Sequence, residues 1–171
     1  MQDEWLDIVD ETDRVVGQQW RAEAYQRGLP NFRVINAFVI NTQGQLWIPR
    51  RTAYKRIFPN GLDFSVAGHV EHGEGYDEAF GRELQEELNW KITAVSYRQL
   101  CYLSPYKNDV PAFMTVYEIQ SDATPAYNSN DFSEAFWLTP AALLKQLMKE
   151  IHPAKPTLAK LVQQFYLSNE R

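Results

Sequence analysis

Hydrophobic and polar residues in the first part of the chain fall into short runs that predict β-strands. Each run is rich in β-branched or aromatic residues and is bounded by turn-forming residues. The predicted strands cover residues 5–9, 15–20, 32–40, 46–49 and 63–67. The sequence NTQG at residues 41–44 separates two of these runs and predicts a hairpin. Residues 21–28 predict a short helix that the terminal glycine closes.

A helical pattern begins at Tyr76. Apolar residues recur there at three- and four-residue spacing, which is the period of a helix with one buried face. The apolar stripe consists of Ala79, Phe80, Leu84 and Leu88. A neighbouring stripe carries three acids, Glu83, Glu86 and Glu87. The helix therefore has one face for the core and one face for charge.

The acidic stripe favours a cation from outside the helix. Like charges three or four residues apart destabilise a helix by about 0.2–0.5 kcal/mol per pair, and Arg82 is the only basic residue nearby. Clustered carboxylates provide the oxygen ligands that a hard divalent cation such as Mg²⁺ prefers. A solvated charged face is the alternative interpretation.

The second half of the chain predicts further strands and two helices. The strands cover residues 92–103, 113–120 and 134–138, with loops at 104–111 and 125–131. Helices are predicted at residues 140–149 and 156–166, each with proline in its first turn. Helices that alternate with strands in this way predict an α/β fold in which a mixed sheet is flanked by helices.

Composition and charge limit the classes of function. A chain of 171 residues suits one domain with a small N-terminal addition. Its net charge of −5 and pI near 5.2 argue against a broad surface for nucleic acid or membranes, which needs a basic patch. We find no signal-peptide pattern and no run of about 18 apolar residues. The single cysteine, Cys101, predicts a reducing, cytoplasmic location.

One segment departs from the acidic balance. Arg50, Arg51, Lys55 and Arg56 lie within seven residues of one another. Guanidinium groups bind phosphate oxygens in bidentate fashion. Arg50, Arg51 and Lys55 are therefore candidates for contacts with substrate phosphates, with Arg51 or Lys55 favoured. A solvated loop with scattered cations is the alternative.

The stretch from Gly68 to Trp90 carries a recognisable motif. Gly68 is followed by five residues, Glu74, seven residues and then Arg-Glu-Leu-x-Glu-Glu at residues 82–87. This spacing resembles the signature box of the Nudix hydrolases, and it should arise by chance in roughly one chain of this length in 10⁵. Where the family usually has glycine after the helix, this chain has Asn89. Asparagine also tolerates the left-handed conformation that ends a helix.

The resemblance implies a fold and an activity. The fold is the Nudix-type α/β/α sandwich with a mixed β-sheet, in one domain with an N-terminal extension at residues 1–30 and the box at residues 68–90. The activity is Mg²⁺-dependent hydrolysis of the diphosphate linkage in a nucleoside diphosphate, a nucleoside triphosphate or a related derivative. The partner is thus a small-molecule phosphoanhydride. The oligomeric state stays open, with a homodimer possible.

The resemblance also assigns roles within the site. The implied ligands of one or more Mg²⁺ or Mn²⁺ ions are Glu83, Glu86, Glu87 and the carbonyl oxygen of Gly68. Glu83, Glu86 or the distant Glu134 would activate water. Arg82 and Glu74 would orient the box, because Arg82 can brace a box carboxylate and Glu74 can fix the loop. His69 and His72 in the same loop are expected to be ordinary loop histidines.

Two other functions compete with hydrolysis. The sequences DIVDETDRVVG at residues 7–17, PRR at 49–51 and K-x-x-FP at 55–59 are similar to the family branch related to isopentenyl diphosphate isomerase. That isomerase uses a cysteine before the box and histidines around the hairpin. This chain has Asn31-Phe32-Arg33 where a His-Arg pair would be sought, and Cys101 follows the box. Hydrolysis is therefore favoured. A non-catalytic nucleotide-binding module is disfavoured because all the box acids are intact.

Overall fold

A six-stranded mixed sheet forms the centre of the computed structural model, which describes residues 3–168. The strands are β3 (Arg33–Ile40), β4 (Leu46–Arg51), β5 (Val66–His69), β6 (Ser96–Leu103), β7 (Phe113–Gln120) and β8 (Phe132–Leu138). Their order is β6-β7-β3-β4-β8, and β5 pairs with β3. The pairing of β3 with β7 is parallel and the others are antiparallel.

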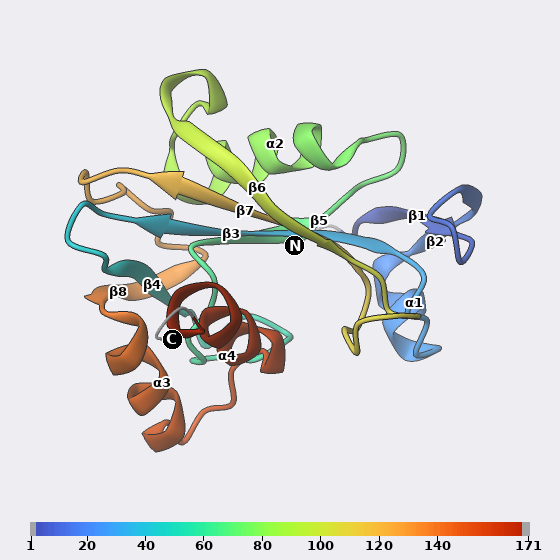
Figure 1. Cartoon of the computed structure of the whole chain (residues 1–171). Coiled ribbons are helices and arrows are strands. Elements are labelled where there is room, and N and C mark those ends of the chain that lie inside the picture. The colour runs from blue at the N-terminus through green and yellow to red at the C-terminus, as the bar shows by residue number, and fades with distance from the viewer. Residues whose placement is uncertain (1–2, 169–171) are drawn as a thin grey trace.

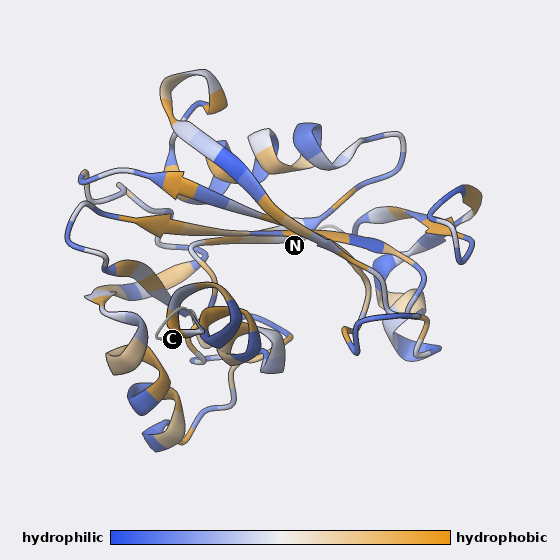
Figure 2. Ribbon diagram, in the orientation of Figure 1, coloured by the Kyte–Doolittle hydropathy of each residue, from blue (hydrophilic) through white to orange (hydrophobic). Residues whose placement is uncertain are grey.

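Strand β3 contributes to two hydrophobic cores because successive side chains of a strand point to opposite faces of the sheet. Ile35, Ala37 and Val39 lie in the core between the sheet and α2 (Tyr76–Leu88). Phe38 lies in the core on the other face, together with Leu143 and residues of the C-terminal helices. Figure 2 shows the corresponding apolar colour along the central strands.

Helices cover both faces of the sheet (Figure 1). Helix α2 lies on one face, and α3 (Pro140–Lys149) and α4 (Pro156–Val162) lie on the other. The chain continues from α4 into a π-helical turn at Gln163–Leu167. This arrangement is an α/β/α sandwich, as expected from the sequence. In the part of the chain that the structure describes, no helix is both long and apolar enough to cross a membrane.

A small N-terminal unit lies beside the main sheet (Figure 1). It consists of a two-stranded antiparallel sheet, β1 (Trp5–Val9) and β2 (Val15–Trp20), and the helix α1 (Arg21–Gln26). Leu6 and Ala24 are fully buried and pack with Phe32 and Ala112, which attaches the unit to the start of β3. The predicted N-terminal hairpin and short helix are both present.

Several predicted strands have other bounds in the structure: β4 continues to Arg51 and β8 begins at Phe132, and β5 and β6 begin later than predicted. The strand expected at residues 63–67 is instead β5 at Val66–His69. The side chain of Asp63 is buried in ion pairs with Arg51 and Lys155, and the strand begins only after it. The strand expected at residues 92–103 begins only at Ser96, after a 3₁₀ turn at Ile92–Ala94. The box helix ends as predicted, with Asn89 in the left-handed conformation at φ 58°.

Candidate active site

Gly68 lies where β5 passes closest to the acidic face of α2. A Cβ atom at this position would lie 2.0 Å from Oε1 of Glu83, which is far inside van der Waals contact. Only glycine therefore allows the β5 backbone and the Glu83 carboxylate to share this space. The same approach lets the backbone amide of Ala67 donate a 3.0 Å hydrogen bond to Glu87 Oε2.

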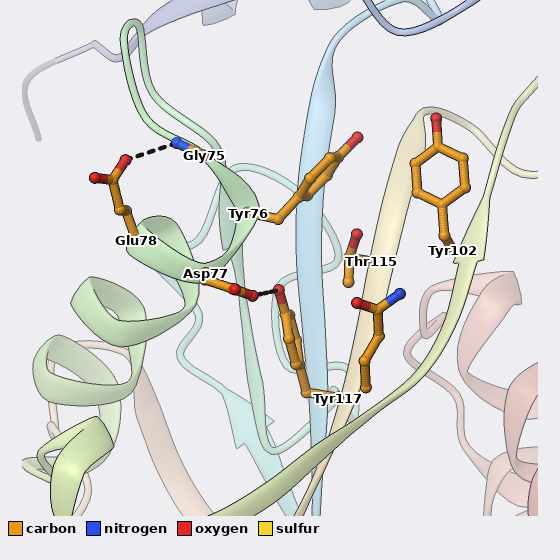
Figure 3. Close-up of a pocket in the computed structure, with 8 residues that line it drawn as sticks. Gly75, Tyr76, Asp77, Glu78, Tyr102, Thr115 and Tyr117 are labelled. Carbon is orange, nitrogen blue, oxygen red and sulfur yellow. Dashed lines mark hydrogen bonds between the residues drawn. The ribbon is translucent and has the colours of Figure 1, made fainter.

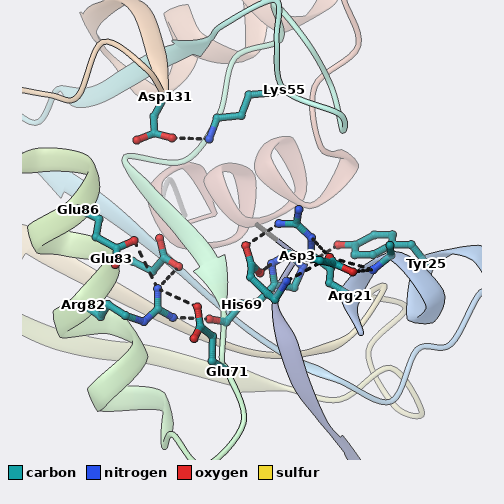
Figure 4. Close-up of polar contacts among 12 residues, drawn as sticks. Asp3, Arg21, Tyr25, Lys55, His69, Glu71, Arg82, Glu83, Glu86 and Asp131 are labelled. Carbon is teal, nitrogen blue, oxygen red and sulfur yellow. Dashed lines mark hydrogen bonds and ion pairs between the residues drawn. The ribbon is translucent and has the colours of Figure 1, made fainter. Parts of the chain in front are cut away.

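Arg82 organises the loop and the helix at once (Figure 4). Its Nε and Nη2 donate to the two carboxylate oxygens of Glu74 at 2.8 and 3.0 Å, and Nη1 donates to Glu83 Oε1 at 2.7 Å. Nη2 also donates to the carbonyl oxygen of His69 at 2.9 Å. Glu74 in turn accepts a 3.0 Å hydrogen bond from the backbone amide of Glu71. The predicted orienting pair thus lies in direct contact, with Arg82 holding a box acid and Glu74 holding the loop.

Of the three acids on the acidic stripe, Glu87 is buried, Glu83 is half-buried and Glu86 is exposed. The residue Glu87 is only 6% exposed, and the Glu83 side chain only 13% exposed. Burial raises the pKa of Glu83 to about 7, although the adjacent Arg82 opposes that shift. Burial and the charge of Glu83 also raise the pKa of Glu87 well above its usual value. Glu86 is more open, with 59% of its side chain exposed.

The donor set fits a hard divalent cation. The charge of Glu83 disfavours ionisation of the buried Glu87, and the nearest cation, Arg82, is shared between Glu83 and Glu74. An added cation would relieve this repulsion, and oxygen ligands are the type that Mg²⁺ prefers. Among residues 3–168, however, no three acidic, histidine or cysteine side chains already surround one point closely enough to hold a metal. Arg82 Nη1 lies between Glu83 Oε1 at 2.7 Å and Glu86 Oε2 at 3.6 Å.

An ion pair between Lys55 and Asp131 faces the box acids across the site (Figure 4). Asp131 follows a loop that covers the end of α2, where the Asn128 backbone amide donates to the Glu87 carbonyl oxygen at 2.8 Å. The charge of Asp131 contributes to the raised pKa of Glu87. The sequence analysis did not select Asp131, because the irregular loop gave no periodic signal.

Arg50 and Arg51, the other two cations predicted to bind phosphate, form ion pairs with carboxylates of the protein itself. Arg50 donates to Glu134 at 2.6 Å and forms a bidentate pair with Glu150 at 2.9 Å. Arg51 donates to Asp63 at 2.6 Å. Glu134 therefore lies on β8 opposite Arg50, and no described contact joins it to the box acids.

Residues from the N-terminal unit also approach the box. Glu4 Oε2 lies 2.9 Å from His69 Nδ1, and the Tyr25 hydroxyl lies 3.0 Å from His69 Nε2. Asp7 Oδ1 lies 2.6 Å from His72 Nδ1. Sequence reasoning assigned no function to Glu4, Asp7 or Tyr25. The one available signal was an acid in the middle of a predicted strand, where acids are depleted.

A separate cavity of about 370 Å³ opens beside the N-terminal turn of α2 (Figure 3). Its aromatic walls include Tyr76, Tyr102 and Tyr117, and its lining does not include Glu83, Glu86 or Glu87. The Tyr76 hydroxyl donates to Asp13 at 2.7 Å and the Tyr117 hydroxyl to Asp77 at 2.6 Å, which fixes both rings.

Comparisons with known proteins agree with the fold. The protein-family model of the NUDIX domain matches residues 30–164 of this chain. An uncharacterized Nudix hydrolase of Nostoc sp. (strain PCC 7120) is 59% identical over 167 residues, which cover 97% of this chain and 98% of that protein. The crystal structure of DR0079 from Deinococcus radiodurans has 50% identity and a TM-score of 0.88, covering 95% of this chain and 99% of that one. A more distant relative, the isopentenyl-diphosphate Delta-isomerase of Klebsiella pneumoniae, is 26% identical over 86% of this chain and 82% of that protein. The chain belongs to the Nudix hydrolase family.

Proposed function

We propose that this Nudix hydrolase cleaves the diphosphate linkage of a nucleoside diphosphate, a nucleoside triphosphate or a related derivative, with Mg²⁺ or Mn²⁺ as its cofactor. The observation that carries the proposal is that the half-buried carboxylate of Glu83 and the buried carboxylate of Glu87 lie beside the backbone at Gly68. A site of this kind combines oxygen ligands for a cation with a group that can accept a proton.

The proposed metal-binding residues are Glu83, Glu86, Glu87 and the carbonyl oxygen of Gly68. A bound divalent cation neutralises the phosphate oxygens, which otherwise repel an incoming nucleophile. In the hydrolysis, the oxygen of water attacks phosphorus, and the bridging P–O bond breaks. The leaving phosphate takes the electron pair. Glu83 or Glu86 accepts the proton from water as general base.

Arg82 and Glu74 are proposed to position the other groups of the site. Arg82 and Glu74 hold the Glu83 carboxylate and the loop in one hydrogen-bonded unit. Glu134 remains a second candidate for the general base, and its ion pair with Arg50 is the competing role. Among the predicted substrate-binding cations, Lys55 is favoured because it faces the box acids beside Asp131 (Figure 4). For all three cations, an ion pair within the protein competes with a substrate role.

A substrate screen tests the proposal. The purified protein is incubated with nucleoside di- and triphosphates, nucleotide sugars and dinucleoside polyphosphates, with Mg²⁺ or Mn²⁺ and with an EDTA control. We expect release of phosphate or a nucleoside monophosphate that EDTA abolishes and Glu87→Gln strongly reduces. Turnover that EDTA leaves unchanged would refute the metal-dependent reaction. Isomerisation of isopentenyl diphosphate without hydrolysis would favour the isomerase instead, and binding without turnover would favour a nucleotide-binding module.

A further inference from the structure

His69 and His72 lie in the box loop, and both meet side chains of the N-terminal unit. The His69 ring is enclosed, with 14% of its side chain exposed. Glu4 approaches its Nδ1 at 2.9 Å and the Tyr25 hydroxyl approaches its Nε2 at 3.0 Å. The Tyr25 ring also meets the imidazole edge to face, with 5.7 Å between the ring centroids. Both ring nitrogens of His69 are therefore approached by residues from the N-terminal segment, and the contact with Tyr25 is a hydrogen bond.

A second set of contacts joins β1 to the same loop. Asp7 has 4% of its surface exposed, and its two carboxylate oxygens contact His72 Nδ1 at 2.6 Å and the Gly73 backbone amide at 3.2 Å. The His72 amide donates to the carbonyl oxygen of Trp5 at 2.7 Å. Leu6 forms an isolated antiparallel bridge with Glu71. Residues 5–7 thus run along the loop as an additional strand partner.

The loop transmits these contacts to the box acids. The carbonyl oxygen of His69 accepts a hydrogen bond from Arg82 Nη2, and the same guanidinium holds Glu74 and Glu83. His69 also directly follows Gly68, whose carbonyl oxygen is a proposed metal ligand. A shift of the loop would therefore move Gly68 and Arg82 together, and Glu83 with them.

We propose that the N-terminal unit is a clamp on the box loop, in which Glu4, Asp7 and Tyr25 are positioning residues for the metal-binding carboxylates. All three lie before residue 30, where the match to the family domain begins. The clamp residues thus lie outside the matched domain, whereas the box lies within it. Its catalytic consequence rests on the proposed function, whereas its effect on the loop does not.

The clamp predicts a loss of turnover rather than of substrate affinity. Small displacements of positioned groups lower the rate by up to about 10²-fold. We expect Asp7→Ala to lower kcat by about 10-fold or more with KM changed less than about twofold. Asp7→Asn keeps an oxygen for the Gly73 amide and should recover part of the rate. Tyr25→Phe removes only the hydroxyl contact with His69 and should have a smaller effect in the same direction.

Two measurements that need no substrate test the clamp directly. Hydrogen exchange reports the backbone amides of His72 and Gly73, which the clamp covers, and titration with Mn²⁺ alone reports the metal site. We expect faster exchange at both amides and weaker Mn²⁺ binding in Asp7→Ala. Asp10→Ala is the matched control, because Asp10 is an acid of the same hairpin that bonds to Thr12 and Arg14 within its own turn.

The outcomes separate the clamp from the proposed function. If Asp7→Ala and Tyr25→Phe fold and leave both loop exchange and Mn²⁺ affinity at the values of the unchanged protein, the clamp is refuted. If Asp7→Ala does not fold, Asp7→Asn and Tyr25→Phe decide by the same two measurements. If the unchanged protein turns over no phosphoanhydride, the proposed function fails, while faster exchange in the variants still supports the clamp on the loop.

Discussion

Replacing Arg51 by alanine distinguishes a substrate-binding cation from a structural one. Its guanidinium donates to Asp63 Oδ2 at 2.6 Å and to the carbonyl oxygen of Ile57 at 2.9 Å. Asp63 is 1% exposed, and Lys155 approaches its other carboxylate oxygen at 2.9 Å. The variant would therefore leave a buried carboxylate with one cation instead of two.

The expected loss of stability is large for one side chain. Removing one partner from a buried ion pair typically costs about 3–5 kcal/mol, because the remaining charge stays buried without compensation. Lys155 still neutralises part of the Asp63 charge, so we expect about 3 kcal/mol. A loss of this size leaves a domain of ordinary stability folded at 25 °C. It lowers the melting temperature by about 6–12 °C for a domain of this size.

Urea unfolding followed by tryptophan fluorescence measures this loss. Arg56→Ala is the control, because Arg56 is an exposed cation of the same segment and should change the unfolding free energy by less than about 0.5 kcal/mol. KM for the best substrate is measured alongside. If Arg51→Ala unfolds like the unchanged protein and raises KM several-fold, the structural explanation is refuted and Arg51 binds substrate as the sequence suggested.

Further predictions concern pH, the box and the remaining charges. Burial opposes ionisation of Asp63, but Lys155 and Arg51 hold its pKa below the usual 3.8. The stability that ionised Asp63 contributes is present above about pH 4 and is lost as the pH falls through the lowered pKa. The urea midpoint should therefore drop more on acidification in the wild-type protein than in Arg51→Ala. Glu87→Gln should lower kcat by about 10²–10⁴-fold and weaken Mn²⁺ binding while the protein stays folded, as checked by kinetics and metal titration. Lys55→Ala should raise KM more than it lowers kcat, and more for triphosphates than for diphosphates; equal KM values for both would exclude the contact. Glu134→Gln should lower kcat by about 10²-fold or more if this residue is the general base, and a pH-rate profile of the variant shows whether a titrating group has been lost.

The box helix could be predicted because its information is local. The apolar period, the acidic stripe and the asparagine at its end all act within a few residues of one another. The structure accordingly ends α2 at Leu88 and places Asn89 in the left-handed conformation. Hairpins could be predicted for the same reason, since turn residues and short strands determine them locally.

The roles of the charged residues outside the box could not be predicted, because their partners are distant in sequence. Arg50 binds Glu150, which lies 100 residues later, and Lys55 binds Asp131, which lies 76 residues later. A cluster of cations in the sequence gives no sign of these carboxylates. The strand predicted at residues 63–67 started too early for a related reason, since Asp63 pairs with Lys155 from the start of α4.

The position of Arg82 also explains how four acids of the loop and helix lie close together, since its guanidinium approaches Glu71, Glu74, Glu83 and Glu86 within 4 Å. Its fork on Glu74 uses Nε and Nη2, so that Nη1 is free to donate to Glu83. A divalent cation at the proposed site would therefore compete with the Arg82 hydrogen bond to Glu83, whereas the bidentate contact of Arg82 with Glu74 would stay intact. Because the bidentate pair keeps the guanidinium in place, Arg82 can remain beside the site and hold the loop while the carboxylates change partners. A lysine could replace the charge at this position, but it could not make the planar contact with Glu74 and the bond to Glu83 together.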